Sequence, residues 1–406
     1  MNPPEHDAYL KCGRKRSRLC LKVFLCLFTL LLLLTAVGGN RVYQQHRALS
    51  WASKNGAEVE ISLPGDWQDK PTWLVTILVA FSDPAPTVVF KNVAAVDLGP
   101  LAGSRLSSVN VYDCKVDNLS TLKHIHVLEH AYFNRVTVQD WSGLVLPSTL
   151  TGFGAVDCDV CDITFLNGLV KLDSLILERT AVQDLSPLKG LANLKRINLT
   201  GSPVSDLGPL AEVSNLQYLD LTGTAVSDLD PLRGLKYLQS LYLAGTRIRN
   251  ISATSDFELV HLDLSFTEVS DISILAEQKY LYLLELSGTR IDDLAALKEI
   301  HSLTGLDLRA AEVSSLPPLA SLRSLRHLDL SGTRMSDVSR LLNMPSLEYL
   351  NLSGSAASDV STLLKIPNLR WVNLKGTQIS EDSFHTLRAA LPNCIILADF
   401  PIAERE

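Results

Sequence analysis

The sequence is poor in cysteine and lacks the short motifs that mark common enzyme classes. Only seven of its 406 residues are cysteine, and three of these lie within the first 26 residues. Too few remain for a disulfide framework, so a hydrophobic core has to hold the fold together. There is no nucleophile elbow, no H-E-x-x-H, no phosphate loop and no complete dinucleotide fingerprint. These absences argue against an enzyme, and we expect no cofactor and no metal.

The charge of the chain is acidic but uneven. The formal net charge is −7, yet the first 40 residues hold six Lys and Arg residues against Glu5 and Asp7. The remainder is therefore more acidic than the chain as a whole. Because an acidic surface repels a phosphate backbone, we expect no nucleic-acid partner. A hydrophobic content of 46% also excludes a long disordered protein.

One hydrophobic stretch, residues 19–39, is long enough to span a bilayer. Only Lys22 interrupts it, and that side chain can snorkel to the head groups. The positive-inside rule then predicts a basic cytoplasmic tail over residues 1–18, a single transmembrane helix over 19–39, and an extracytoplasmic body, periplasmic or at the cell surface. A signal peptide cleaved near residues 36–38 is the alternative, and the long basic lead favours the anchor.

Residues 40–84 predict a small α/β cap between this helix and the body. Asn40–Asn55 has the pattern of a short helix that Gly56 ends. Apolar residues then alternate from Val59 to Leu63, which is typical of a strand. Residues 71–81 predict a second helix, which is too short to cross a membrane.

From residue 85 onward the sequence repeats every 22 residues, with two spacings of 21. Apolar residues recur at offsets 0, +3, +5, +10 and +13. Offsets +2 to +6 predict a short strand whose +3 and +5 side chains point inward and whose +2, +4 and +6 side chains point outward. Asp at +12 can cap a 3₁₀ turn, and Thr or Ser at +8 can bond to buried backbone. The offset-0 residues are Ala85, Leu106, Leu128, Leu150, Leu172, Leu194, Leu216, Leu238, Leu259, Leu281, Leu303, Leu325, Leu347, Leu369 and Leu391.

The pattern L-x-x-L-x-L at this period resembles the leucine-rich-repeat family, and runs such as Thr180–Leu188 resemble its internalin-like subclass of bacterial type. The resemblance implies an α/β repeat solenoid over residues 85–380, with short parallel strands on a concave face and 3₁₀ or turn segments on a convex face. The chain departs from the family at +8, where Asn is usual. Ser380 is placed to cap a helix, so residues 381–406 predict a C-terminal helix and closing strand, with Cys394 at a core position.

Two outward-facing columns of the predicted strands form the candidate ligand-binding surface. Offset +4 is rich in carboxylates, and like charges on adjacent strands destabilise a sheet. Offset +2 is rich in aromatic residues, which are the usual anchors of protein interfaces. We therefore expect a protein or peptide ligand of basic character, although a solvated acidic surface is the simpler explanation of the carboxylates. The candidate residues are Tyr218, Asp220, Tyr242, His261, Asp263, Glu285, Asp307, His327, Asp329, Tyr349 and Trp371.

Other patterns carry weaker or structural predictions. Charges of alternating sign at offset +9 predict a ladder of ion pairs between repeats. Its members are Arg247, Glu268, Arg290, Glu312 and Arg334. The Cys158-x-x-Cys161 pair and the histidines at 124, 126 and 130 lack the further ligands that zinc needs. A structural or envelope scaffold without a single ligand is the first rival function, and an enzyme using these clusters is the second.

The repeat that starts at Leu238 is one residue short, and Phe266 replaces the glycine that is usual at +7 of the next repeat. A tolerated deletion and a partner site both explain this irregularity. The deletion is the simpler of the two.

Overall fold

The computed structural model describes the repeat region almost completely and little of what precedes it. The described residues are 47, 48, 52, 54–60, 85, 87–313 and 321–400. The predicted tail, the predicted transmembrane helix over 19–39 and the predicted helix over 71–81 lie outside them. Within the described ranges, no helix is long and apolar enough to cross a membrane.

The described chain divides into two compact units, the first comprising residues up to Ala131 together with Val138–Pro147. Its elements are β1 (Ala57–Glu60), β2 (Thr87–Lys91), β3 (Ala95–Asp97), η2 (Gly99–Leu101), β4 (Ser108–Tyr112), β5 (Lys115–Asp117) and η3 (Leu119–His124). β1 is antiparallel to β2, whereas β2 pairs with β4 and β3 with β5 in parallel. β1 confirms the first part of the strand predicted in the cap, and Gly56 before it has the positive φ of a residue that ends a helix.

The second unit comprises Tyr132–Thr137 and the chain from Ser148 onward. The boundary between the two units falls within the strands β6 (His130–Asn134) and β7 (Thr137–Val138). The strands that follow are β8 (Gly152–Val156), β9 (Ser174–Glu178), β10 (Arg196–Asn198), β11 (Tyr218–Asp220), β12 (Ser240–Tyr242), β13 (His261–Asp263), β14 (Leu283–Glu285), β15 (Gly305–Asp307), β16 (His327–Asp329), β17 (Tyr349–Asn351), β18 (Trp371–Asn373) and β19 (Ile395–Leu397).

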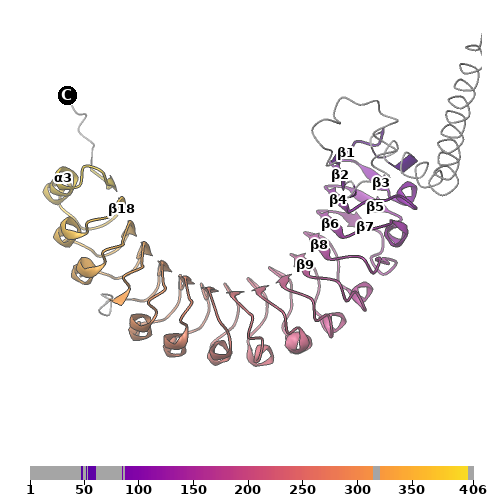
Figure 1. Ribbon diagram of the computed structural model, residues 1–406. Helices are drawn as coiled ribbons and strands as arrows, with labels where there is room; N and C mark the ends of the chain where they lie inside the picture. Colours follow the sequence, from indigo (N-terminus) through magenta and orange to yellow (C-terminus); the bar gives the residue numbers. More distant parts are fainter. Residues whose placement is uncertain are drawn as a thin grey trace, which may run out of the picture. The chain divides into compact units, whose positions relative to one another are not determined.

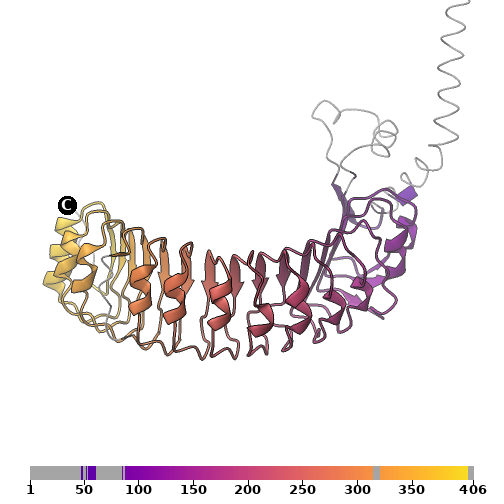
Figure 2. The same ribbon diagram turned by 60° about the horizontal axis from the view of Figure 1, so that its bottom comes forward.

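A 3₁₀ helix follows nearly every one of these strands. The 3₁₀ helices of the second unit include η4 (Thr164–Leu166), η5 (Ser186–Leu188), η6 (Gly208–Glu212), η7 (Asp230–Leu232), η8 (Ser252–Asp256), η9 (Ser273–Glu277), η10 (Ala295–Glu299), η12 (Ser339–Asn343) and η13 (Ser361–Lys365). Within this unit the strands line the concave side and the 3₁₀ helices the convex side, as Figures 1 and 2 show. This unit therefore has the predicted solenoid architecture, although the range predicted for the solenoid, residues 85–380, also includes part of the first unit.

Parallel pairing of successive strands fixes the register of the repeats. Tyr218 lies opposite Ser240, one period of 22 residues later in the chain. The short repeat gives a spacing of 21, with Tyr242 opposite Asp263, and its 3₁₀ helix η8 still forms. The missing residue thus leaves the sheet register intact, which favours a tolerated deletion.

The inward-facing columns form one continuous core. The leucines at +3 and +5, such as Leu262 and Leu264, are completely buried. At +8, the Thr224 hydroxyl donates to the carbonyl oxygen of Leu221 in its own turn, at 2.7 Å. Ser202 instead donates to the carbonyl of Leu177 in the preceding turn, at 2.6 Å. The predicted role of the +8 hydroxyls is confirmed, because each satisfies a buried backbone acceptor.

The carboxylates at +12 hold the start of the 3₁₀ helices, as predicted. Asp184 Oδ1 accepts a hydrogen bond from the backbone N–H of Ser186 at 2.8 Å. Hydrogen bonds from Ser186 also lower the pKa of Asp184. The same bond recurs along the convex side at Asp206, Asp228, Asp271, Asp293, Asp337 and Asp359.

The strands are shorter than the sequence predicts, because from β10 to β18 they end at offset +4 rather than +6. Where the residue at +4 is Asp or Asn, its side chain accepts the backbone N–H of +6, which bends the chain away from the sheet. β12 and β14 have Tyr242 and Glu285 at +4 and end there without this bond. The residue at +7 then takes a positive φ, which is the reason for the glycine column. Phe266 occupies that position with φ 56° and a 66% exposed side chain, and its ring lies over Gly288 at the same offset of the next repeat.

The C-terminal turn confirms the predicted helix and corrects the predicted register. α3 (Glu381–Ala390) begins after Ser380, whose hydroxyl accepts the N–H of Ser383, and it buries Phe384. The helix makes the last repeat two residues longer, so that Val372 lies opposite Ile396. Cys394 is therefore only half-buried and does not occupy the predicted core position.

The predicted ion-pair ladder at +9 is wrong. The Glu268 carboxylate pairs with Arg249, whose Nε lies 2.8 Å away, rather than with Arg247 or Arg290. Arg249 lies at +11 of the short repeat, which a pattern based on one offset does not consider. Exposed pairs of this kind contribute about 0.2–1 kcal/mol.

Candidate functional site

The parallel register brings the predicted site residues into two adjacent columns on the outward face of the second unit. The +2 column runs from Tyr218 to Trp371 and the +4 column from Asp220 to Asn373, one residue per strand. Their side chains are half-buried to exposed, apart from Asp263, which is only 9% exposed, and Gly305. The two columns therefore form one surface, which we call the strand face.

The +4 carboxylates have a local structural role that the sequence analysis did not recognise. Asp263 Oδ1 accepts the N–H of Ser265 at 2.8 Å, and Asp329 Oδ1 accepts that of Ser331 at the same distance. Asp220 and Asp307 make the same turn, and so do the asparagines of this column, for example Asn198. The preference for Asp or Asn at +4 thus follows from backbone geometry, whatever the protein binds.

The charges of the acidic column are also partly compensated. Arg309 Nη2 donates to Asp307 Oδ2 at 3.1 Å, and its Nε lies 3.7 Å from Asp329. Asn351 donates to the second oxygen of Asp329 at 2.9 Å. Arg309 and Asn351 therefore bind two of the four consecutive carboxylates from Asp263 to Asp329, and His261 binds a third, Glu285.

Tyr242 and Glu285 are the members of the +4 column that cannot make this turn, and His261 joins them across three strands. Its Nδ1 lies 2.8 Å from the Tyr242 hydroxyl oxygen and its Nε2 lies 2.9 Å from Glu285 Oε1. In the neutral tautomer with a proton on Nε2, His261 donates to Glu285 and accepts from Tyr242. The hydrogen bond with His261 lowers the pKa of Glu285, so this carboxylate stays ionised.

Asp263 lies beside this network and is the most buried carboxylate of the column. Burial is the main cause that raises its pKa, and the charge of Glu285 raises it further, although the hydrogen bonds from Ser265 oppose the shift. A buried anion that is only partly compensated destabilises the fold.

Asp263→Asn is accordingly expected to increase stability at neutral pH. The folded state holds the Asp263 proton more tightly than the unfolded state does, so the parent loses stability as the pH rises above the ordinary carboxyl pKa of about 4. Asn keeps the turn, as Asn198 does, and does not ionise. Urea unfolding at pH 4 and pH 7 measures the effect, with Asp220→Asn as the matched control. An equal gain at both pH values would contradict the burial argument.

A hollow of about 570 Å³ opens on the strand face between β14 and β18. The His327 and Tyr349 rings stack in parallel along one side, with centroids 4.5 Å apart and planes 5° apart. Residues that line the hollow include Leu283, Glu285, Gly305, His327, Tyr349 and Trp371. The hollow thus combines an aromatic wall with carboxylates. Besides Glu285, which belongs to the His261 network, five predicted site residues line it: Asp307, His327, Asp329, Tyr349 and Trp371.

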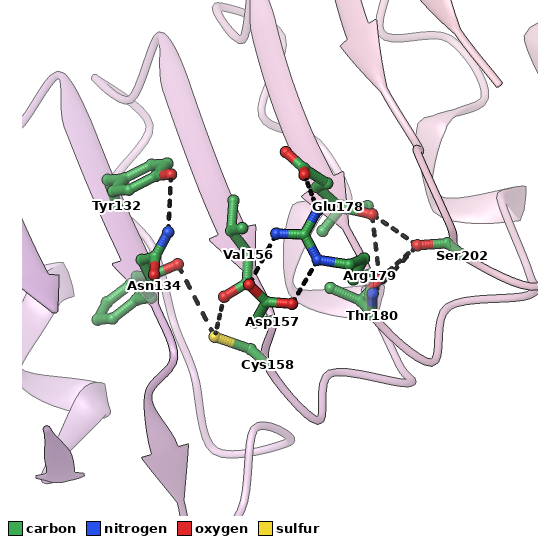
Figure 3. A network of polar contacts seen from close by, with 11 residues as sticks. Tyr132, Asn134, Val156, Asp157, Cys158, Glu178, Arg179, Thr180 and Ser202 are labelled. Atoms are coloured by element: carbon green, nitrogen blue, oxygen red, sulfur yellow. Dashed lines mark hydrogen bonds and ion pairs between the residues drawn. The ribbon is translucent and has the colours of Figure 1, made fainter. Parts of the chain in front are cut away.

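A second polar cluster lies in the first turns of the second unit (Figure 3). Arg179 donates to Asp157 Oδ2 at 2.7 Å and pairs with Glu178. The Cys158 thiol donates to the carbonyl of Val156 at 3.3 Å, and burial raises its pKa. A buried, protonated thiol is a poor metal ligand and a poor nucleophile, so Cys158 serves packing.

The rival sites suggested by the sequence are not assembled. Cys161 is exposed whereas Cys158 is buried. No group of three or more His, Cys, Asp or Glu side chains in the described part of the chain is placed to hold a metal ion. The predicted site did not include Asn351 and Gly305 of the strand face, nor Arg309, which lies at +6 beside it. The break in the +2 column at Gly305 is visible in the sequence once the register is known.

Comparisons with known proteins agree with this architecture. The family profile "Leucine Rich repeats (2 copies)" matches residues 323–365. An internalin, InlF, from Listeria monocytogenes is 24% identical over 78% of this chain and 87% of its own, with a TM-score of 0.63. The functional domain of InlJ from the same organism is 17% identical over 74% of this chain and 72% of its own, with a TM-score of 0.56.

A plant peptide hormone receptor, RGFR1, solved in complex with RGF2, is 16% identical over 63% of this chain and 48% of its own, with a TM-score of 0.52. No curated protein matches the chain. The chain therefore has a leucine-rich-repeat fold that is structurally similar to that of Listeria internalins, and residues 323–365 match the repeat profile itself.

Proposed function

We propose that this protein binds a protein or peptide ligand on the strand face from β11 to β18, with the hollow beside His327 and Tyr349 as the centre of contact. The observation that carries the proposal is the aromatic hollow, because partly buried Tyr and Trp side chains are the usual anchors of interfaces. The peptide receptor with the same fold supports it by analogy.

The proposed ligand is basic. Asp220, Asp263, Glu285, Asp307 and Asp329 lie on the strand face from β11 to β18, against Arg309 and Lys375 at its edge. The carboxylates outnumber these basic side chains, even though several carboxylates form hydrogen bonds with turns and neighbouring side chains. An excess of this kind steers a basic partner towards the face and raises the association rate.

We also propose that residues 19–39 anchor the protein and that the strand face acts outside the cytoplasm. The apolar length and the preceding basic residues support the anchor, and the similarity to internalins supports an extracytoplasmic site. N-terminal sequencing of the mature protein tests the anchor, since a mature chain that begins near Gly39 would show cleavage.

Affinity capture with the full chain tests the binding function. The parent bait is compared with a Tyr349→Ala/Trp371→Ala bait and with a control bait carrying Tyr237→Ala/Tyr280→Ala. The control tyrosines are 50% and 62% exposed and lie outside the two columns. A ligand that the parent and the control retain and the first variant loses supports the proposal. If every bait retains the same proteins, the scaffold function replaces it.

Replacing Asp263, Asp307 and Asp329 by Asn and Glu285 by Gln is expected to slow association with the captured ligand and to remove its salt dependence. Asn preserves the strand-ending turns, as Asn351 shows by accepting the N–H of Ser353. Charge on an interface rim acts mainly on encounter. Binding kinetics at two salt concentrations measure the change. Association rates that match the parent at both salt concentrations would mean that the carboxylates serve the fold alone.

A further inference from the structure

The +2 column has one gap among the strands that carry the hollow, at Gly305. On the neighbouring strands the same position holds Leu283 and His327. Adjacent parallel strands lie about 4.8 Å apart, and Leu283 leans into part of the space that a side chain at 305 would take. The hollow still reaches Gly305 beside Leu283, and we call this remaining space the slot. Gly305 does not have a positive φ, and its backbone conformation therefore does not require glycine. The absent side chain makes room for Leu283 and leaves the hollow open beside it.

The two walls of the slot differ in chemistry. Leu283 forms the apolar wall and leans over Gly305, since a Cβ added there would lie 2.4 Å from Leu283 Cδ2. His327 forms the opposite wall. Tyr349 covers one face of the His327 ring, so the other face is directed towards Gly305. A flat group entering the slot would stack on this ring.

One carboxylate near the slot has an oxygen that can still accept hydrogen bonds from a ligand. Asp307 and Asp329 are engaged through both oxygens by their own turns, Arg309 and Asn351. Glu285 bonds through Oε1 to His261, and its Oε2 has no hydrogen-bond partner among the described residues. Its low pKa keeps it anionic. The slot therefore offers an apolar wall, an aromatic face and an unshared carboxylate oxygen.

We propose that the slot at Gly305 receives one arginine side chain of the ligand, an inference that rests on the proposed function. The methylene groups pack on Leu283, the guanidinium stacks on His327, and its N–H groups donate to Glu285 Oε2. Arginine fits better than lysine because its planar head can stack and form hydrogen bonds at the same time. A purely apolar side chain would leave the Glu285 charge desolvated and unpaired.

The test titrates the full chain with a synthetic peptide, acetyl-Gly-Gly-Arg-Gly-Gly-amide. Matched peptides carry citrulline, which keeps the shape without the charge, or norleucine, which keeps only the apolar stem. The readout is the indole N–H signal of Trp371, assigned from its loss in Trp371→Phe. The arginine peptide is expected to shift this signal saturably, with binding at least about tenfold tighter than the citrulline peptide, since a charged hydrogen bond is lost.

Gly305→Leu fills the slot with the side chain that the neighbouring strand carries, and we expect it to abolish the shift. Ser240→Leu makes a comparable change in the same column outside the hollow and should leave it unchanged. No shift with any peptide, equal binding of the norleucine peptide, or unchanged binding by Gly305→Leu would each overturn the proposal.

Different results would contradict the proposed binding function and the proposed arginine slot. A captured ligand that Tyr349→Ala/Trp371→Ala loses and Gly305→Leu retains would show that the strand face binds without an arginine in the slot. Loss of the ligand by neither variant would instead remove the proposed function itself.

Discussion

Leu264→Ala is expected to lower the free energy of unfolding by about 2–5 kcal/mol, through the lost burial and the cavity it leaves. Leu264 lies at +5 of a middle repeat and is completely buried. Its neighbours Leu243 and Leu286, at the same offset in the flanking repeats, are buried to the same degree. Each layer of the core therefore contacts the layers on either side, and the cavity would open between three repeats.

Urea unfolding and hydrogen exchange measure this effect. Each repeat contacts only its neighbours, so protection should fall first around β13 and less at the ends of the unit. Leu342→Ala is the matched control, because Leu342 is 42% exposed and the same truncation leaves no buried cavity. Equal destabilisation by the two variants, or a loss of protection spread evenly over the unit, would contradict the nearest-neighbour account of the core.

Tyr349→Ala and Trp371→Ala are each expected to raise the dissociation rate of the ligand by roughly 30-fold, which corresponds to about 2 kcal/mol for an interface anchor. The association rate should change little, because anchors act mainly after docking. Tyr349 supports the His327 ring, so its removal should weaken ligand stacking as well as direct contact.

Surface-based kinetics with the captured ligand separate these two rates. The control variants Tyr237→Ala and Tyr280→Ala remove exposed tyrosines outside the hollow and should leave both rates unchanged. The full-length fold of every variant is checked by its unfolding midpoint. Should the anchors alter association alone, the hollow would be steering the ligand rather than holding it.

The repeat period was sufficient to predict the solenoid. A leucine at +3 or +5 can be buried in only one way once strands pair in parallel at a spacing of one period, as Leu219 and Leu241 do. The convex caps were equally predictable, because the bond from Ser186 to Asp184 joins residues two apart in the chain. Features that are local in the chain or strictly periodic can therefore be predicted from the sequence alone.

The sequence was less informative where one offset has two structural uses. The +4 carboxylates suggested a ligand from their charge, whereas Asp263 and Asp329 each also end a strand through a turn. Their charge pattern alone cannot separate the two roles. The longer last repeat also displaced Cys394 from the core, because the helix before it changed the register.

The sequence by itself determined the repeat, the inward and outward columns and the residues of the strand face, since each depends on spacing along the chain. Only the tertiary structure decided which of those residues cooperate. The bond from His261 to Glu285 crosses between strands, and the slot at Gly305 exists because Leu283 and His327 stand on either side of it. Side-chain directions and contacts between repeats depend on the register and the packing of three strands at once, and no single repeat contains that information.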